Sequence, residues 1–514
     1  MKHLVRFVVR AAAAVCLFLA TAAPAGAAWL RAESENFIVY GDMGEARLRE
    51  QVVTLEDFNA LLRLLTGTTE PASPNKLRVY LVRGIGELRQ VRRVGNFVGG
   101  FYTATPSGVA AFADTSAAGA TSEIVFHEYA HHFMLQYHPT AYPPWYVEGF
   151  AEFMMTARFT ERHTEFGQLS PIRSRWLSDR ALWLPMERVL FESADIDGPA
   201  GRSRYYAQSW VLTHYILNDP ARVAQLRAYV AALNGGDDPR RAFAASFGKS
   251  PAELQREVQS YAFRGMTYRR MDRASIAQTP QIRIERLPAS ADDLVLLEAA
   301  LTVRGLDPEI MLARARQLAA RHPGDAYAKR VLAHAEALHG DGDAAQRLLT
   351  ELIAAAPQDA ELLYLRGMRD LVAGERDPAT RLARFRQARL WFSRAHRLDR
   401  NHFPTLYRYV QTFTQEPGFL SNNNSEVMLL AQELAPQVPE IRMNAATMHL
   451  ARGEFEIAES LIRPLASTAH EGRYSARARE LLAKARARDN GGVSVTFAPP
   501  PATEGESARG QRLF

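Results

Sequence analysis

The chain has 514 residues, 47% of them hydrophobic, and a formal net charge of +6, so two globular domains with additional tails are expected. The positive charge is scattered, and the one short basic cluster, Arg89 to Arg93, has no interleaved aromatic residues. A solvated basic face is therefore favoured over a nucleic-acid-binding surface, and no nucleic-acid partner is expected.

The first 27 residues have the pattern of a cleaved signal peptide. Lys2, Arg6 and Arg10 precede an apolar stretch from Ala11 to Ala23, and small residues follow at positions 25–27. The apolar stretch is too short for a stable membrane span, with an uncleaved anchor as the alternative. The single cysteine lies inside this leader, so no disulfide is expected in the mature chain. We expect a periplasmic or secreted protein of net charge +3, because the leader carries three basic residues and no acid.

Residues 29 to about 120 have the patterns of a mixed α/β segment. Period-two alternation predicts strands over residues 36–40 and 77–82, with a helix over residues 46–65 between them. Two further strands, over residues 99–104 and 109–113, flank the turn at residues 106–108 and form a predicted hairpin.

The next predicted helix carries the most informative motif of the chain, His127-Glu128-Tyr129-Ala130-His131. Residues four apart project from one face of a helix, so His127 and His131 can bind one metal ion. Glu128 then lies beside the open coordination position, where it can accept a proton from water. Ser122 is the expected N-cap. The alternative is a purely structural pair of buried histidines.

Pro143 and Pro144 pre-set the first turn of a second predicted helix, which carries Glu148 and Glu152, again four residues apart. Two carboxylates on an apolar helix need a cation or a histidine nearby. We expect Glu148 to be the third ligand of a His-His-Glu zinc site. Glu152 is expected to hold the ring of His127 in its metal-binding tautomer, with a solvated surface position as the alternative.

These two motifs together resemble the gluzincins, the clan of thermolysin-like and aminopeptidase-like zinc peptidases. The tract from Pro144 to Glu152 is most similar to an exported bacterial group in which a peptidase-MA-like domain precedes tetratricopeptide repeats. The resemblance is strong over residues 123–153 and loose elsewhere. The interval from His131 to Glu148 is slightly short, Glu152 replaces the usual aspartate, and no Gly-Ala-Met-Glu-Asn tract is present. The amino-terminus recognition of aminopeptidases is therefore not carried over.

The resemblance also implies two elements that act on the substrate. A tyrosine on a later helix, over residues 205–215, donates to the oxyanion; Tyr206 is preferred, with Tyr205 and His214 as alternatives. The strand before the zinc helix is a sheet edge to which the substrate backbone adds, which gives Ala111 and Phe112 a substrate-binding role. The alternative for this strand is one half of a plain hairpin.

Residues 121 to about 265 are expected to be mainly helical and to complete a catalytic domain over residues 28–270. A strand over residues 281–287 is expected near the domain boundary. Residues 290–488 show tetratricopeptide-like spacing, in the segments 332–357 and 445–465, and predict stacked helix pairs. An ordinary helical bundle is the alternative. Residues 489–514 are rich in Gly, Pro and Ser and are expected to be disordered.

The expected fold is thus an α+β zincin-like catalytic domain followed by an all-α tetratricopeptide-like solenoid. The first functional hypothesis is an exported Zn²⁺-dependent endopeptidase whose solenoid binds protein substrates or a protein partner. The second is a non-catalytic periplasmic repeat scaffold with a vestigial peptidase domain. The presence of His127, Glu128, His131 and Glu148 together favours the enzyme.

Overall fold

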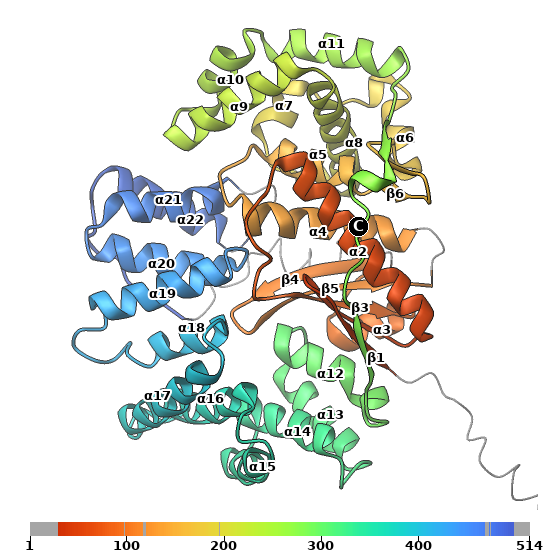
Figure 1. Ribbon diagram of the computed structural model, residues 1–514. Coiled ribbons are helices and arrows are strands. Elements are labelled where there is room, and N and C mark those ends of the chain that lie inside the picture. Colours follow the sequence, from red (N-terminus) through yellow and green to blue (C-terminus); the bar gives the residue numbers. More distant parts are fainter. Residues whose placement is uncertain are drawn as a thin grey trace, which may run out of the picture.

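The computed structural model describes residues 29–96, 98–116, 120–194, 196–467, 472 and 474–497. The predicted signal peptide and residues 498–514 of the predicted tail lie outside this part of the chain. The described residues form a twisted sheet with a block of helices on one side and a curved stack of helix pairs on the other (Figure 1). The last helices of this stack return to the level of α4 (Ala120–Tyr137) and α5 (Pro144–Met154) in Figure 1.

The larger sheet has six strands in the order β4-β5-β3-β2-β1-β9. Strands β2, β3 and β5 are parallel to one another, whereas β1, β4 and β9 are antiparallel to their neighbours. The predicted strands and the predicted hairpin are confirmed within one or two residues. The bounds are β1 (Leu30–Glu33), β2 (Phe37–Gly41), β3 (Leu77–Val82), β4 (Gly100–Thr105), β5 (Gly108–Asp114) and β9 (Arg283–Arg286).

Alternation along these strands gives the sheet two buried faces. One face carries Val39, Val79 and Ala111 and packs against the helices α2 (Glu45–Thr66) and α4 (Ala120–Tyr137). The other face carries a row of stacked rings: Tyr40 on Tyr80, Tyr80 on Phe112 and Phe101 on Phe112, with centroids 4.6, 4.8 and 4.7 Å apart. Burial of both faces explains why the central strands contain so few charged residues.

The prediction that β5 is a sheet edge is wrong. Strand β5 lies between β3 and β4 and is paired on both sides, so the edge strand of the hairpin is β4. Ala111 and Phe112 are 2% and 1% exposed, and Phe112 faces away from α4, in the row of stacked rings. Their predicted substrate-binding role therefore has no support in the fold, because neither their backbone nor their side chains are accessible.

The segment from α4 to α11 is mainly helical, as predicted, and lies on the α4 side of the sheet (Figure 1). A small second sheet of order β6-β7-β8 borders it. The elements are α5 (Pro144–Met154), β6 (Arg158–Phe159), β7 (His163–Phe166), α6 (Pro171–Leu177), η1 (Arg180–Leu182), α7 (Met186–Phe191), α8 (Gly198–Leu217), α9 (Pro220–Gly235), α10 (Pro239–Phe247) and α11 (Pro251–Phe263), followed by β8 (Arg269–Asp272) and η2 (Arg273–Ser275). The short helix α3 (Ile85–Val91) lies earlier in the chain, between β3 and β4.

The border between the two halves differs from the expected linker. The predicted strand near residue 284 exists, but as β9 it pairs with β1, with Leu30 opposite Arg286. The next helix, α12 (Ala291–Val303), covers the ring-bearing face of the sheet and shares its core. The α/β half therefore extends to Arg286, and the first repeat helix is buried against it.

The C-terminal half is a succession of helix pairs in which each helix packs against its neighbours along the chain, and α14 also contacts α12 and α16. This is the contact pattern of a solenoid rather than of a closed bundle. Aspartates cap the starts of four successive helices: Asp307, Asp325, Asp341 and Asp359. The helices are α13 (Pro308–Ala319), α14 (Ala326–His339), α15 (Gly342–Ala355), α16 (Ala360–Arg376), α17 (Arg381–Leu398), α18 (Phe403–Gln411), α19 (Asn422–Leu434), α20 (Pro439–Ala451), α21 (Phe455–Ala466) and α22 (Ser475–Arg486).

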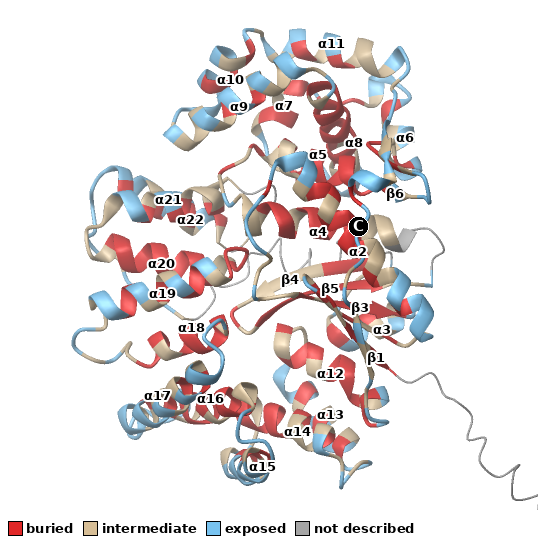
Figure 2. Cartoon of the chain, in the orientation of Figure 1, coloured by how far each residue is buried: buried red, intermediate tan, exposed pale blue. Residues whose placement is uncertain are grey.

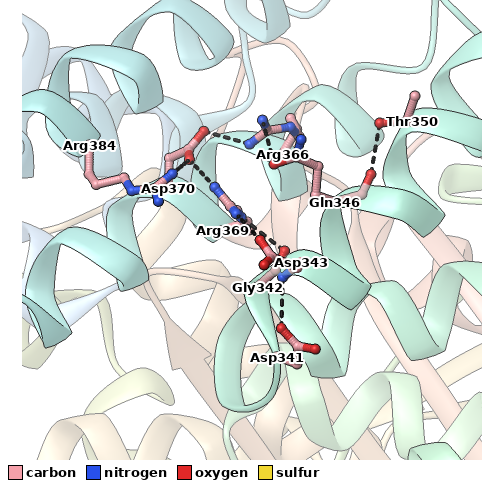
Figure 3. A network of polar contacts seen from close by, with 9 residues as sticks. All are labelled: Asp341, Gly342, Asp343, Gln346, Thr350, Arg366, Arg369, Asp370 and Arg384. Atoms are coloured by element: carbon pink, nitrogen blue, oxygen red, sulfur yellow. Dashed lines mark hydrogen bonds and ion pairs between the residues drawn. The ribbon is translucent and has the colours of Figure 1, made fainter. Parts of the chain in front are cut away.

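A network of charges ties α15, α16 and α17 together (Figure 3). Asp370, which is 1% exposed, accepts from Arg366 at 2.5 Å, from Arg369 at 2.7 Å and from Arg384 at 3.4 Å. Arg369 also donates to Asp343, at the start of α15, at 3.0 Å. Because the buried charges of Asp370 and Arg369 are paired with each other and with residues of neighbouring helices, the network fixes the register between the helices.

The first part of the predicted tail is packed rather than extended into solvent. Val493, Val495 and Phe497 lie against the core, and the ring of Phe497 is 5.0 Å from that of Tyr407 on α18. Apolar residues within a Gly- and Pro-rich stretch thus anchor residues up to 497 on the repeats. No helix in the described part of the chain combines the length and apolar character needed to cross a bilayer.

Candidate metal centre

Helices α4 and α5 bring three potential metal ligands together. Helix α4 begins at Ala120, two residues before the predicted cap Ser122, and carries His127 and His131 on one face. Helix α5 begins at Pro144, as predicted from its two prolines, and presents Glu148 to this face. In the described part of the chain, these residues form the one group of three side chains whose donor atoms lie within 4.8 Å of one another.

The donor atoms form a triangle with the dimensions of a zinc site. Nε2 of His127 and Nε2 of His131 are 3.0 Å apart, and each lies 3.6 Å from Oε2 of Glu148. Ligands of a tetrahedral zinc ion, at metal distances of roughly 2.0–2.1 Å, are about 3.4 Å from one another. The residues present therefore fit a tetrahedral ion with three protein ligands and one open position.

The centre is buried on one side and accessible on the other. His127 and Glu148 are 2% and 1% exposed, whereas the side chain of His131 is 18% exposed. Burial lowers the pKa of His127, but the carboxylates of Glu148 and Glu152 outweigh it and raise this pKa overall. A divalent cation would replace the proton that this negative environment favours.

Glu152 lies directly behind His127, and an arginine holds it there. Its carboxylate is fully buried and accepts two hydrogen bonds from Arg173 of α6, at 2.9 and 2.8 Å. Its Oε1 is 3.6 Å from Nδ1 of His127, slightly beyond hydrogen-bonding distance. The surface alternative for Glu152 is thereby excluded, and its main partner is an arginine that the sequence did not single out.

Glu128, next to His127 in the chain, is also buried, 9% exposed. Burial first, and then the charge of Glu128, raise the pKa of Tyr102 on the edge strand β4. The hydroxyl of Tyr102 is 3.0 Å from Nδ1 of His132, and burial lowers the pKa of His132 to about 4. Contacts between the edge strand and α4 thus set the position of this strand relative to Glu128.

Helix α8 carries the three candidate oxyanion donors, and their side chains have different neighbours. The ring of Tyr206 lies 6.2 Å from that of His127, and Arg173 stacks on it at 4.9 Å. Tyr205 instead points toward the carbonyl of Glu192, at 3.5 Å. His214 is held by Tyr261 and the carbonyl of Thr267, at 2.7 and 2.9 Å. Of the three side chains, that of Tyr206 faces the centre.

A glycine allows α8 to approach this closely. A Cβ atom on Gly149 would lie 2.2 Å from Oγ1 of Thr213 and 2.3 Å from the carbonyl oxygen of Ser209. Only a residue without a side chain fits at this crossing of α5 and α8. Gly149, next to Glu148 in the chain, therefore determines how near Tyr206 comes to the ligands.

Sequence reasoning missed two residues around the centre, Arg173 and Tyr102. A fully buried carboxylate requires a cation or several donors, so the need for a partner for Glu152 was predictable. The identity of that partner was not, because Arg173 comes from a helix that carries no motif. The proximity of Tyr102 to the centre follows only from the order of the strands.

Comparison with known proteins gives little further information. No family model matches the chain, and no curated protein matches it. Among solved structures, a crystal structure of a thermophilic TPR protein from Thermus thermophilus matches with 17% identity and a TM-score of 0.32, over 39% of this chain and all of that one. This similarity is to a protein made of helical repeats.

Proposed function

We propose that this protein is an exported zinc-dependent endopeptidase with a helical repeat domain that takes part in binding protein substrates. The observation that carries the proposal is the triangle of His127, His131 and Glu148, with a buried Glu128 next to it in the chain. The signal-peptide pattern in residues 1–27 supports export to the periplasm or the medium. The resemblance of residues 123–153 to gluzincins supports peptide-bond hydrolysis.

The residues of the centre have complementary roles in this reaction. His127, His131 and Glu148 would hold zinc, which would supply polarisation of the scissile carbonyl and a lower pKa for water. Glu128 accepts a proton from the attacking water while the water oxygen bonds to the carbonyl carbon. As the carbon–nitrogen bond breaks, Glu128 delivers this proton to the leaving amine. The hydroxyl of Tyr206 donates to the carbonyl oxygen while it carries negative charge.

The residues behind the ligands keep the site assembled. Arg173 neutralises the charge of Glu152, and the pair lies behind the ring of His127 and limits its rotation. Partners of metal-ligating histidines commonly account for a 10- to 100-fold effect on metal affinity, as an order of magnitude. The proposal therefore includes Arg173 and Glu152 as positioning residues.

The proposal is tested with the mature protein and a peptide library derived from a proteome. We expect the zinc-loaded protein to cut internal peptide bonds, a chelator to stop cleavage, and added zinc to restore it. Mass spectrometry of the products distinguishes internal cleavage from trimming of the ends. A zinc-loaded protein that cuts none of the peptides would contradict the proposal.

The alternative, a scaffold without catalytic activity, is favoured by the extent of the helical repeats, from α12 to α22. It predicts that a bound protein partner remains intact after prolonged incubation with zinc-loaded protein. The enzyme predicts fragments of that partner, and their loss on chelation.

A further inference from the structure

A cleft opens directly beside the candidate metal ligands. It has a volume of about 320 Å³ and is bordered by His131 and Glu148 themselves. This is about ten times the share of one water molecule in the liquid, enough for one large side chain. A substrate residue in this cleft would lie next to the bond at the metal centre.

The walls of the cleft are mainly apolar. Helix α4 contributes Met134 and Leu135, one turn beyond His131, and the α5 region contributes Tyr142 and Val147. Leu135 and Val147 are only part-buried, so their apolar surface is accessible to a substrate. Burying an apolar side chain against these residues is favourable. The polar residues at the border of the cleft are His131, His138, Thr140, Glu148 and Ser467.

One wall comes from the repeat domain. Pro464 and Ser467, at the end of α21, line the cleft opposite α4 and α5, more than 300 residues away in the chain from Glu148. The preceding repeat helix, α20, contacts the edge strand β4. Both the cleft and the sheet edge next to the metal centre are therefore bordered by the last repeats, which return to α4 in Figure 1.

We propose that this cleft is a specificity pocket that receives a large apolar side chain of the substrate beside the scissile bond, and that α21 forms part of it. This inference rests on the proposed peptidase function and extends it. The repeats contribute to selectivity at the catalytic centre itself, in addition to any remote binding. The favoured substrates carry a residue such as Leu, Met or Phe beside the scissile bond.

The test is a substitution at the end of α21 that fills the pocket with a large side chain. Ser467→Trp places a large ring in the cleft without changing α4 or α5, and Ser460→Trp makes the same change on the exposed surface of α21. With two matched peptides that carry either Phe or Gly at one position, we expect Ser467→Trp to lower kcat/KM for the Phe peptide at least tenfold, since filling an apolar pocket has about this effect. Ser460→Trp should cleave both peptides as the wild type does, and Ser467→Trp should lower kcat/KM for the Gly peptide much less than for the Phe peptide.

Binding and zinc content separate failure of this inference from failure of the proposed function. Binding of both peptides is measured by calorimetry in Glu128→Gln protein, with and without Ser467→Trp, and zinc content is measured in all variants. Tighter binding of the Phe peptide that Ser467→Trp removes supports the pocket even if no variant cleaves. Cleavage with no preference between Phe and Gly, or a preference that Ser467→Trp leaves unchanged, would overturn the pocket while the peptidase stands. Loss of zinc in Ser467→Trp would also overturn it, because α21 would then support the metal centre instead of selecting substrate.

Discussion

Arg173 donates two hydrogen bonds to the carboxylate of Glu152, from Nε to Oε2 at 2.9 Å and from Nη2 to Oε1 at 2.8 Å. Glu152 is fully buried, and burial opposes the charge on Arg173 while Glu152 raises the pKa of that guanidinium. The pair forms a charged support behind His127, one that an apolar pair of the same size would not provide.

Removing the positive charge of Arg173 alone should therefore lower the free energy of unfolding. Arg173→Met leaves the carboxylate of Glu152 buried and without its partner, and we expect unfolding to become easier by about 3–5 kcal/mol. Zinc affinity should fall by roughly 10- to 100-fold. Thermal melts and calorimetric zinc titration measure the two effects.

Two controls make this test specific. Arg175→Met changes a neighbouring exposed arginine of α6 and should change neither quantity. The double variant Arg173→Met/Glu152→Gln removes both charges and should regain much of the stability. An Arg173→Met protein that melts at the wild-type temperature would refute the supporting role of the pair.

Tyr206→Phe should reduce turnover without preventing binding. Loss of an oxyanion donor typically lowers kcat by about 100- to 1000-fold, whereas KM should change little because the ring remains. Tyr205→Phe is the matched control, since its hydroxyl makes only a 3.5 Å contact with the carbonyl of Glu192. Equal kcat values for Tyr206→Phe and wild type would mean that another residue donates to the oxyanion.

Zinc should stabilise the α/β half of the protein. An ion present at a thousand times its dissociation constant contributes about 4 kcal/mol to the stability of a folded site. We expect melting curves of the wild type to shift upward with zinc and back with a chelator. Glu148→Ala removes one ligand and should abolish most of the shift. An undiminished shift in this variant would place zinc elsewhere.

His334 on α14 predicts a pH dependence of stability in the repeats. It is 9% exposed, and burial lowers its pKa from 6.5 to about 4. Between these values the unfolded chain binds a proton that the folded chain does not, so stability falls as pH decreases from 6.5 toward 4. The loss from this one group reaches about 3 kcal/mol.

The check is a series of denaturant titrations between pH 7 and pH 4.5. His334→Gln should make the dependence shallower by the share of this one group, and His163→Gln, at a more exposed histidine whose side chain is 32% exposed, should leave it unchanged. An identical slope in wild type and His334→Gln would mean that another group is responsible.

The features that were predictable from sequence are those set by short stretches of chain. Spacing alone places His127 and His131 on one face of α4, and two prolines mark the start of α5. The fold then brings Glu148 within 3.6 Å of both histidines. The buried strands and the apolar faces of the repeat helices likewise follow from local periodicity, and Figure 2 shows these faces turned inward.

Long-range pairings were not predictable in this way. The resemblance implied that β5 is the edge of the sheet, and the hairpin pattern alone does not reveal which of its two strands joins the other strands; the edge strand is β4. Strand β9 pairs with β1 across more than 250 residues, and Arg173 reaches Glu152 from another helix. Each of these pairings depends on tertiary packing, which selects among several partners with suitable chemistry.

The most direct test of the central claim compares zinc content and peptide cleavage in wild type and Glu128→Gln. The substitution keeps the size and position of the side chain but removes its ability to accept a proton. We predict one zinc ion per chain in both proteins and cleavage by the wild type alone. Full cleavage by Glu128→Gln, or absence of zinc from both proteins, would contradict the account.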